Sequence, residues 1–467
     1  MMAAPRRVDV VVLGAGITGL ATAFHLARAG RSVQVVEAAP EVGGVIRSEV
    51  VERPEGRWVV ELGPNTVVDS RPAVAPLLAA AGLADQRLDA AATGARRYVW
   101  WHGALRPLPA GPLGFLATPL FPLSGKLRFF AEPFVPRRAT AEEGDESVGD
   151  FVRRRLGSAF LDSAVGPFVS GVYAGDPERL SIRWAVPRIW ALEDRHGGLV
   201  RGAVALLRER RRHPEAPRPT KRMLSFPDGL ATLPRRLAAE VPVATGSPVR
   251  ALRRLPDGRF AVETDDAAWE AADVVVTLPA PAAAELLADA TGGASRPLAE
   301  VAYAPLVVAA YGFRREQVAH PLDAFGFLAP RVEDLRLLGC LFPSSIFPGR
   351  APDGHVLLTT FAGGRTDPAT PALGDEELDR LLTGELDRAL GLSGPPVMRL
   401  VRRWPRALPQ YELGHGRFVA LAESIERELP GLHLAGSYRD GVSVPDRLEK
   451  AAAVAATIAR DAAETRP

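Results

Sequence analysis

The feature that most constrains the fold lies near the N-terminus, where an apolar run leads directly into three closely spaced glycines. Residues 8–13 are apolar apart from Asp9, and Gly14, Gly16 and Gly19 follow. A β-branched run of this kind is typical of a buried parallel strand. Glycines at this spacing allow a sharp turn into a helix whose N-terminal amides can bind a pyrophosphate. We therefore predict a strand, a turn and a helix over 17–29 that together bind a dinucleotide.

An acidic residue at the end of the next predicted strand supports this interpretation. Glu37 follows Gly19 by 18 residues, and a carboxylate at this position can accept a hydrogen bond from a ribose hydroxyl. A glycine motif alone is a weak signal, because purely structural glycine turns are common. With a strand before it, a helix after it and Glu37 beyond, it favours FAD or NAD.

A second pair of glycines separates a flavin from a nicotinamide. Gly43 and Gly44 come soon after Glu37, and without a Cβ they let the backbone lie close to a bound cofactor. With Arg47 and with Gly63, Pro64 and Asn65, this arrangement resembles the amine oxidase and phytoene desaturase superfamily, in which the paired glycines run along FAD. The usual basic residue two positions before the glycines is Glu41 here, so pairing with a phosphate would fall to Arg47 or to backbone amides.

Composition limits the class of protein. The chain has 467 residues, 47% hydrophobic and 24% charged, which predicts a globular protein of two or three domains. A net charge of +2 gives no indication of nucleic-acid binding. Cys340 is the single cysteine and lies in an apolar segment, so we expect a buried side chain, no intramolecular disulfide and a cytoplasmic location. The histidines show no paired ligand spacing, so we predict no metal.

The order of motifs predicts an α/β protein with a discontinuous Rossmann-type FAD domain, an antiparallel-sheet substrate domain and an inserted helical domain. We assign residues 1–90, 221–295 and 405–467 to the FAD domain, 296–404 to the substrate domain and 91–220 to the helical insertion. The last FAD segment contains an apolar strand, a turn at Gly436 and a final helix over 449–461. Its helix N-terminus is a second place where amides face a cofactor.

The apolar stretch over 112–136 has two interpretations. It contains bulky apolar residues, several prolines and the cations Lys126 and Arg128, so it cannot span a bilayer. It could lie in the membrane interface with its cations among the headgroups. Alternatively it could form a buried wall of the substrate pocket, and both interpretations stay open.

Further motifs resemble those of the protoporphyrinogen oxidase family over nearly the whole chain. They are Gly-Gly-Val-Ile-Arg-Ser at 43–48, Glu-Leu-Gly-Pro-Asn at 61–65, Arg-Tyr-Val at 97–99, Gly-Val-Tyr-Ala-Gly-Asp-Pro at 171–177, Phe-Gly-Phe-Leu at 325–328, Leu-Gly-Cys-Leu-Phe at 338–342, Phe-Pro-Gly-Arg at 347–350, Leu-Thr-Thr-Phe-Ala-Gly-Gly at 358–364 and Leu-Pro-Gln-Tyr-Glu-Leu-Gly-His at 408–415. The resemblance implies FAD-dependent oxidation of protoporphyrinogen IX to protoporphyrin IX in heme biosynthesis. It further implies removal of six electrons, O₂ as acceptor, three H₂O₂ formed, peripheral membrane contact and a homodimer.

The same resemblance implies roles for particular residues. Arg97 would pair with a substrate propionate, Leu328 and Leu341 would clamp a pyrrole, and Phe361 would stack on a neighbouring ring. Gly171 would bring its carbonyl to the macrocycle NH groups. Residues implied to border FAD are Val249, Trp404, Gly436, Ser437, Val442, Ser443 and Val444. No catalytic acid or base is implied, since hydride passes from a bridging carbon to flavin N5 and alignment of the two ring systems matters most.

Each assignment has a structural alternative, and the function has rivals. Arg97 could make an ordinary strand-end salt bridge, Gly171 could break a helix, and Leu328, Leu341 and Phe361 could be sheet core. Coproporphyrinogen III, with four propionates, is the alternative substrate and should need more cations around the cavity. Another flavin amine oxidase or a carotenoid desaturase would lack the set of Arg97, Gly171 and Phe361. A flavin-binding protein without turnover is the third alternative.

Overall fold

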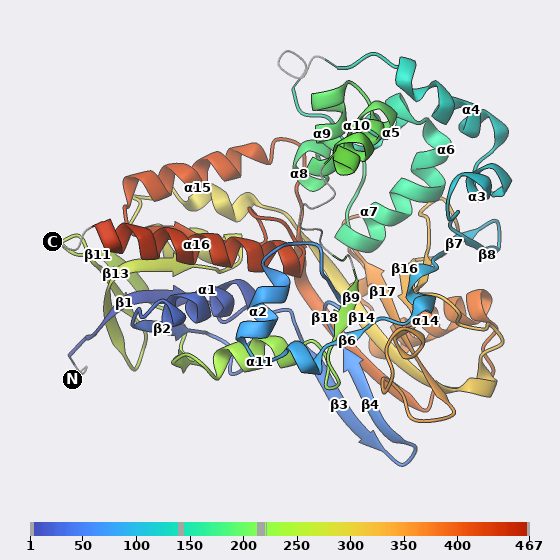
Figure 1. Cartoon of the computed structure of the whole chain (residues 1–467). Coiled ribbons are helices and arrows are strands. Elements are labelled where there is room, and N and C mark those ends of the chain that lie inside the picture. Colours follow the sequence, from blue (N-terminus) through green and yellow to red (C-terminus); the bar gives the residue numbers. More distant parts are fainter. Residues whose placement is uncertain (1–3, 139–143, 213–219, 221, 465–467) are drawn as a thin grey trace.

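The computed structural model describes residues 4–138, 144–212, 220 and 222–464. It has two large sheets at opposite ends and a group of helices beside the second sheet (Figure 1). Strand β1 (Arg6–Leu13) and the last helix, α16 (Val444–Glu464), both lie in the part of the molecule that holds the first sheet (Figure 1). The predicted mixed α/β fold is therefore confirmed.

The first sheet has seven strands and carries the glycine turn. Its strands are β1 (Arg6–Leu13), β2 (Val33–Val36), β10 (Val243–Ala244), β11 (Ala251–Arg254), β12 (Phe260–Glu263), β13 (Ala268–Val276) and β19 (Leu432–Leu434). β1 lies between β2 and β13 and runs parallel to both. Residues 10–13 of β1 are completely buried, as their continuous apolar run predicted. β10, β13 and β19 come from later parts of the chain, so this sheet is assembled from separate segments.

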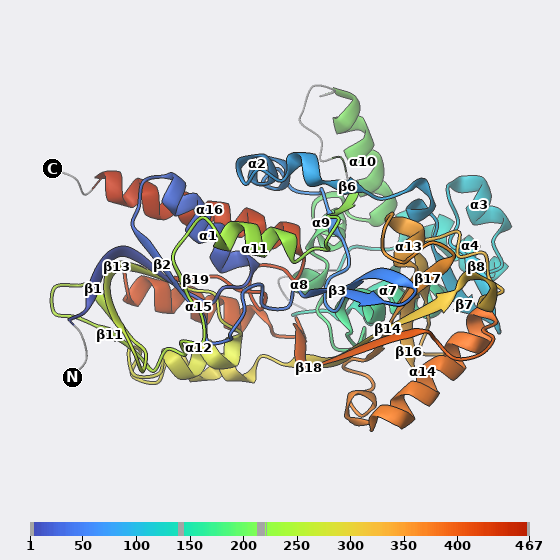
Figure 2. The same ribbon diagram turned by 90° about the horizontal axis from the view of Figure 1, so that it is seen from below.

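Helices cover both faces of this sheet (Figure 2). On one face lie α1 (Ile17–Arg28), α2 (Val74–Ala80), α11 (Thr232–Ala238) and α16 (Val444–Glu464). On the other lie α12 (Ala280–Leu286), η5 (Arg296–Glu300) and α15 (Gly416–Glu428). The predicted start of the final helix at residue 449 is wrong, because α16 begins at Val444. The Ser443 hydroxyl accepts a hydrogen bond from the Asp446 amide at 3.3 Å, and Pro445 is well suited to a first helical turn.

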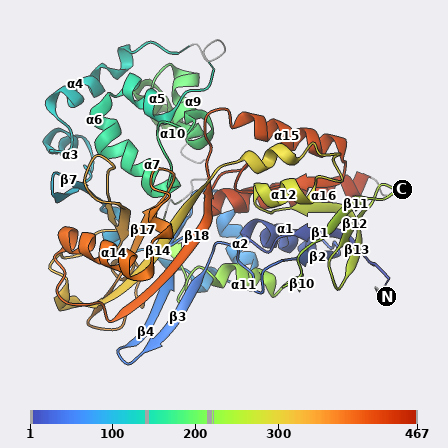
Figure 3. The same cartoon turned by 180° about the vertical axis from the view of Figure 1, so that it is seen from behind.

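The second sheet also has seven strands, in the order β18-β14-β17-β16-β15-β7-β8. They are β7 (Tyr98–Trp101), β8 (Ala104–Pro107), β14 (Tyr303–Arg314), β15 (Gly326–Leu328), β16 (Leu337–Leu341), β17 (His355–Gly363) and β18 (Met398–Pro409). All neighbours are antiparallel except β15 and β7. α14 (Asp375–Leu390) covers one face, and the opposite face is turned towards the helical group (Figure 3).

Three strands, β7, β8 and β18, do not follow the predicted domain boundaries. The hairpin of β7 and β8 lies within the segment assigned to the helical insertion, yet it pairs with β15 in the second sheet. Strand β18 runs through the predicted boundary at 404/405. Strand pairing so distant in sequence leaves no local signal, and the division into three domains stays a prediction.

The helical group consists of short helices tied together by buried ion pairs. It contains α3 (Pro112–Ala117), α4 (Leu123–Ala131), η3 (Glu132–Phe134), α5 (Val148–Arg155), α6 (Ser158–Phe160), the π-helical η4 (Leu161–Val165), α7 (Gly166–Tyr173), α8 (Ile182–Ala185), α9 (Pro187–His196) and α10 (Leu199–Arg212). The buried Arg155 guanidinium pairs with Glu132 at 3.1 Å and also with Glu193. Glu132 in turn accepts hydrogen bonds from the first amides of α10, Leu199 and Val200. No helix in the described ranges is long and apolar enough to cross a membrane.

The remaining elements connect these parts. They are the hairpin of β3 (Ser48–Arg53) and β4 (Gly56–Glu61), the small sheet of β5 (Val67–Val68), β6 (Leu88–Asp89) and β9 (Met223–Ser225), and the short helices η1 (Ala84–Gln86), η2 (Ala92–Ala95), η6 (Arg315–Gln317), α13 (Pro343–Ile346) and η7 (Thr370–Ala372). Trp58 of β4 packs against Leu357 and Met398 of the second sheet. Strand β4 is therefore packed against the second sheet.

Candidate active site

The three positions of the first turn are glycine for different structural reasons. A Cβ on Gly19 would lie 2.0 Å from the Gly14 carbonyl oxygen, and Gly14 has a φ of 101°. Both positions therefore need glycine for close packing and for a left-handed backbone. A Cβ on Gly16 would meet nothing within 4 Å. Gly16 borders open space at the N-terminus of α1, where no side chain caps the amides and no acidic residue occupies the first turn.

Glu37 lies beside this turn. Its carboxylate accepts hydrogen bonds from the Ala15 amide at 2.6 Å and from the Ala39 amide at 2.8 Å. Each carboxylate oxygen has a second lone pair, which leaves capacity for a hydroxyl donor. The Glu37 carbonyl accepts from the Ser247 amide at 2.9 Å, and the half-buried Val249 follows in the same segment. The position of Glu37 at the end of β2 is as predicted.

The paired glycines pack directly on the turn. The Gly43 amide donates to the Ala15 carbonyl at 2.8 Å, and a Cβ on Gly44 would lie 3.3 Å from the Cα of Gly16. A Cβ on Gly63 would lie 1.9 Å from the Val45 carbonyl oxygen. The segments 43–47 and 61–65 are thus brought side by side next to the N-terminus of α1.

The polar side chains of these segments have different environments. The Arg47 guanidinium pairs with Glu41, so its charge is already compensated, which favours backbone amides as the partners of a phosphate. Pro64 and Asn65 are half-buried. The Asn65 side-chain amide donates to the Gly63 carbonyl at 3.1 Å, while its buried oxygen has no hydrogen-bond partner among the described residues. A buried acceptor without a partner fits a site that receives a polar ligand.

The turn before α16 is held by side chains from the segment before α15. The Tyr411 hydroxyl donates to the Ser437 carbonyl and accepts from the Gly441 amide at 2.8 Å. Buried His415 Nε2 lies 2.7 Å from the Tyr438 carbonyl, and burial lowers the pKa of His415 to about 4. The neutral imidazole therefore donates this hydrogen bond. Gly436, Ser437 and residues 442–444 lie at or beside the N-terminus of α16.

These features fit a dinucleotide cofactor. Such a ligand needs room for its pyrophosphate, and the space beside Gly16 and the uncapped amides of α1 provide it. Its hydroxyl and amide groups need hydrogen-bond acceptors, and the Glu37 carboxylate and the unpaired Asn65 oxygen are available for this role. The roles of Tyr411 and His415 were missed from the sequence. Their signal was the motif at 408–415, which places polar aromatic side chains in an apolar segment.

Three of the residues assigned to the substrate lie on one face of the second sheet. Leu328 pairs with Gly339, and Gly339 pairs with Phe361, so these positions share a face. Leu341 is two residues from Gly339 on β16 and lies on the same face. We call Leu328, Leu341 and Phe361 the sheet floor.

Gly171 of α7 meets this floor directly. A Cβ on Gly171 would lie 2.3 Å from Leu328 Cδ2, so α7 approaches the sheet closely only because this residue is glycine. Four of the predicted substrate residues are therefore in one place. The sequence did not single out Phe168 and Val172, which also lie on α7 beside Gly171 and are 45% and 43% exposed.

Trp404 connects the floor to the cofactor segments. Its Nε1 donates to the Leu62 carbonyl at 2.7 Å, and its ring packs with Phe361 against buried Leu306 and Val308. The end of β4 and the sheet floor therefore lie next to each other, with Trp404 between them.

Arg97 makes no salt bridge in the part of the chain that the structure describes. Its guanidinium lies 5.1 Å from the Phe325 ring centroid and donates to the Ala95 carbonyl at 3.3 Å. Partial burial lowers the pKa of Arg97. The strand-end salt bridge that was the alternative role of Arg97 is made instead by Arg96, which pairs with Asp323. Arg97 is left as a cation beside apolar surface.

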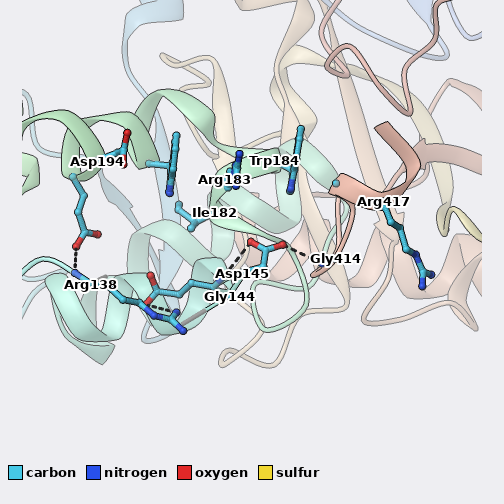
Figure 4. Close-up of a pocket in the computed structure, with 13 residues that line it drawn as sticks. Arg138, Gly144, Asp145, Ile182, Arg183, Trp184, Asp194, Gly414 and Arg417 are labelled. Atoms are coloured by element: carbon cyan, nitrogen blue, oxygen red, sulfur yellow. Dashed lines mark hydrogen bonds and ion pairs between the residues drawn. The ribbon is translucent and has the colours of Figure 1, made fainter. Parts of the chain in front are cut away.

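Two cavities lie away from these residues. One of about 300 Å³ separates α8 and α9 from the start of α15, and Arg183, Trp184 and Asp145 line it (Figure 4). Another of about 450 Å³ lies beside α14. The Asp145 carboxylate in the first cavity accepts from Ser181 Oγ at 2.6 Å and from the Gly414 amide at 3.0 Å, so it joins chain segments and is not left open to a ligand.

Neither a metal-binding cluster nor a reactive cysteine was found among the described residues. Among the described residues no cluster of three or more His, Cys, Asp or Glu could hold a metal ion. Cys340 is buried, as predicted, and burial raises the pKa of its thiol. A thiol of this kind is unreactive.

Comparison with known proteins agrees with this geometry. The family model described as flavin containing amine oxidoreductase matches residues 17–459. Protoporphyrinogen oxidase of Oryza sativa chloroplasts is 33% identical over 93% of this chain and 85% of its own length. Coproporphyrinogen III oxidase of Bacillus subtilis is 29% identical over 94% of this chain and 96% of its own length. A crystal structure from Exiguobacterium sp. 255-15, assigned as a protoporphyrinogen oxidase, superposes with a TM-score of 0.80, 25% identity and coverage of 99% and 100% of the two chains.

Proposed function

The chain belongs to the flavin containing amine oxidoreductase family and is an FAD-dependent oxidoreductase, and from this premise we propose that it oxidises protoporphyrinogen IX to protoporphyrin IX. The overall reaction removes six electrons, reduces three O₂ to three H₂O₂ and belongs to heme and tetrapyrrole biosynthesis. One observation carries the proposal. Gly171 and the sheet floor come together next to the cofactor segments, joined through the hydrogen bond from Trp404 to Leu62.

The residues of the site have separate tasks. The aliphatic and aromatic side chains of the floor support the macrocycle, and the Arg97 guanidinium, which has no carboxylate partner among the described residues, binds a propionate. Gly171 lets the α7 backbone come close enough to present a carbonyl to the macrocycle NH groups. FAD, when bound, supplies the acceptor for two electrons in each cycle. The chain's contribution is chiefly to hold the substrate at a fixed distance and orientation and to exclude water.

Turnover with each porphyrinogen tests the function. Purified protein is incubated aerobically with protoporphyrinogen IX or coproporphyrinogen III, and porphyrin fluorescence and H₂O₂ are followed. We expect porphyrin formation with three H₂O₂ for each protoporphyrin. If only coproporphyrinogen III is oxidised, it is the substrate in place of protoporphyrinogen IX. If neither porphyrinogen is oxidised and the protein instead oxidises an amine or a carotenoid, the proposal is overturned.

Adjacent arginines provide a matched control for the propionate contact. Arg97→Gln removes the unpaired cation and should raise KM at least tenfold, in keeping with the loss of a charge-assisted hydrogen bond of roughly 1.5–3 kcal/mol. Arg96→Gln removes the exposed cation paired with half-buried Asp323 and should leave KM within about threefold. Equal effects of the two substitutions would exclude a specific role for Arg97.

We also propose that the helical group contacts a membrane surface. Six large apolar side chains of α3, α4 and η3 are exposed, led by Leu113 at 83% and Phe134 at 85%, and the others are Leu116, Leu123, Leu127 and Phe130. This exposure favours interfacial contact over the buried pocket wall. The cations do not point freely to headgroups, since Lys126 donates to the Leu116 and Thr118 carbonyls and Arg128 to the Arg154 carbonyl.

Vesicle sedimentation tests the membrane contact. Protein is centrifuged with vesicles of phosphatidylcholine and phosphatidylglycerol, as wild type, as the double variant Leu113→Ser and Phe134→Ser, and as the control Val50→Ser on β3, whose side chain is 44% exposed. Wild type and control should sediment, and the double variant should stay in the supernatant. Sedimentation of all three, or of none, would contradict the proposal. We further propose that the protein is a homodimer and lies in the cytoplasm at the periphery of the membrane. Analytical ultracentrifugation in detergent tests the homodimer.

A further inference from the structure

One face of α7 is apolar, borders the sheet floor and is only partly covered. At 100° per residue, Phe168, Gly171 and Val172 fall within one third of the helix circumference. Of the other α7 positions, Pro167, Val169 and Ser170 are buried, and Val169 packs into the core of the helical group. The exposed face thus belongs to the side of α7 on which Gly171 meets Leu328.

The contact between Gly171 and the sheet floor leaves no room for a side chain. Gly171 would place a Cβ 2.3 Å from Leu328 Cδ2, whereas Phe168 and Val172, on either side of it, keep nearly half of their surface exposed. Two large apolar side chains are therefore left uncovered beside an apolar floor. A large ligand with an apolar edge between them would cover both surfaces.

The charges around this space are uneven. Arg97 lies at the β7 end of the sheet without a carboxylate partner among the described residues. Phe168 and Val172 bring no charge to the α7 side. Arg365, whose amide donates to the Ala174 carbonyl at the end of α7, is paired with Glu412 at 2.7 Å. A carboxylate placed against Phe168 and Val172 would lose water without gaining a partner.

We propose that Phe168 and Val172 form the wall that faces the pyrroles lacking propionates, and that this wall makes the site prefer a dicarboxylate porphyrinogen to a tetracarboxylate one. The inference rests on the proposed function and deepens it. The vinyl-bearing half of protoporphyrinogen IX suits an apolar wall, whereas the corresponding half of coproporphyrinogen III carries two further propionates.

A rival source of charge lies on the same sheet face. Arg402 pairs across the sheet with Val308, which pairs with Phe361, so Arg402 also points to the floor side. Its guanidinium lies 4.7 Å from the Trp404 ring centroid. If Arg402 binds a further propionate, the preference for two carboxylates fails.

The test adds a cation to the wall and compares the two substrates. Wild type, Phe168→Arg, Val172→Arg, Arg402→Gln and the control Val204→Arg are assayed for kcat/KM with each porphyrinogen. Val204 lies on α10 and is 39% exposed, so it matches Val172 in residue type and exposure. Flavin absorbance of each variant reports cofactor loading separately from turnover.

We expect wild type to favour protoporphyrinogen IX at least tenfold, which is about 1.4 kcal/mol. Each wall arginine should lower this ratio about tenfold, mainly through KM, because the added cation pairs with the extra propionate. Val204→Arg and Arg402→Gln should leave the ratio unchanged. If Phe168→Arg does not bind flavin, Val172→Arg alone tests the wall.

Other results overturn either the inference or its basis. The wall would be refuted as the determinant if the ratio of kcat/KM for the two substrates is unchanged in both wall variants that load flavin. It would also be refuted if this ratio rises in Arg402→Gln because coproporphyrinogen oxidation is lost. Wild type that oxidises both substrates equally would refute it too. Wild type that oxidises neither would instead remove the proposed function.

Discussion

Adding one methyl group at Gly171 tests the closest contact in the substrate site. In Gly171→Ala the new Cβ would lie 2.3 Å from Leu328 Cδ2, whereas carbon atoms in contact prefer about 3.5–4.0 Å. Leu328 must therefore move by about 1.2 Å or more, or α7 must shift. Either change alters the space between α7 and the sheet floor.

The expected loss of stability follows from two opposing terms. Overpacking typically costs about 1–3 kcal/mol, and alanine gains up to about 1 kcal/mol over glycine in a helix. We expect the free energy of unfolding to fall by about 0–3 kcal/mol. Gly384→Ala in α14 is the matched control, because a Cβ there would meet nothing within 4 Å, and it should raise the free energy of unfolding by up to about 1 kcal/mol.

Urea unfolding of a double-mutant cycle isolates the contact. Leu328→Ala removes the atom that the new methyl group meets, so the double variant should recover about 1–2 kcal/mol relative to additivity. Gly171→Ala should also lower kcat/KM for protoporphyrinogen IX while flavin loading is retained. If Gly171→Ala matches Gly384→Ala in stability and shows no coupling to Leu328, the close approach of α7 to the sheet is refuted.

Three further predictions concern the cofactor side. Gly19→Ala should abolish FAD binding, measured by flavin absorbance, because its Cβ would meet the Gly14 carbonyl at 2.0 Å; full loading would contradict the packing. Trp404→Phe removes the hydrogen bond to the Leu62 carbonyl and should weaken FAD binding about two- to tenfold by fluorescence titration, whereas an unchanged affinity would separate Trp404 from the cofactor segments. Folding lowers the pKa of His415 from 6.5 to about 4, so the stability associated with its neutral form is present above pH 6.5 and lost as the pH falls towards 4. Between pH 7.5 and 5 the free energy of unfolding of the wild type should fall by about 2 kcal/mol more than that of His415→Gln, as measured by urea unfolding. An equal fall in the two proteins would argue against His415 as the cause.

The nucleotide-binding turn could be predicted because its determinants are local. The buried strand, the glycines and Glu37 lie within 30 residues, and Gly14 and Gly19 have steric reasons that hold wherever such a turn packs on its strand. The start of α16 was misplaced because Pro445 was not recognised as a first-turn residue. In that case the capping serine decided the boundary.

The substrate side depended on contacts between distant segments. The periodicity of the sequence could not show that β7 pairs with β15, more than 200 residues later. It also could not show that Arg96, and not Arg97, would form the ion pair with Asp323. The motif match nevertheless named Gly171 and the residues of the sheet floor, which the fold brings together. Phe168 and Val172 were missed because an apolar face on a short helix looks like ordinary core, and only its exposure distinguishes it.

Anaerobic reduction of the bound flavin tests the central claim most directly. FAD-loaded protein is mixed with protoporphyrinogen IX without O₂, and flavin absorbance is followed together with porphyrin formation. Our account predicts that the flavin loses its colour and that admitting O₂ restores it with formation of protoporphyrin IX. A flavin that stays oxidised at saturating porphyrinogen, while another reductant bleaches it readily, would show that this substrate does not reach the cofactor.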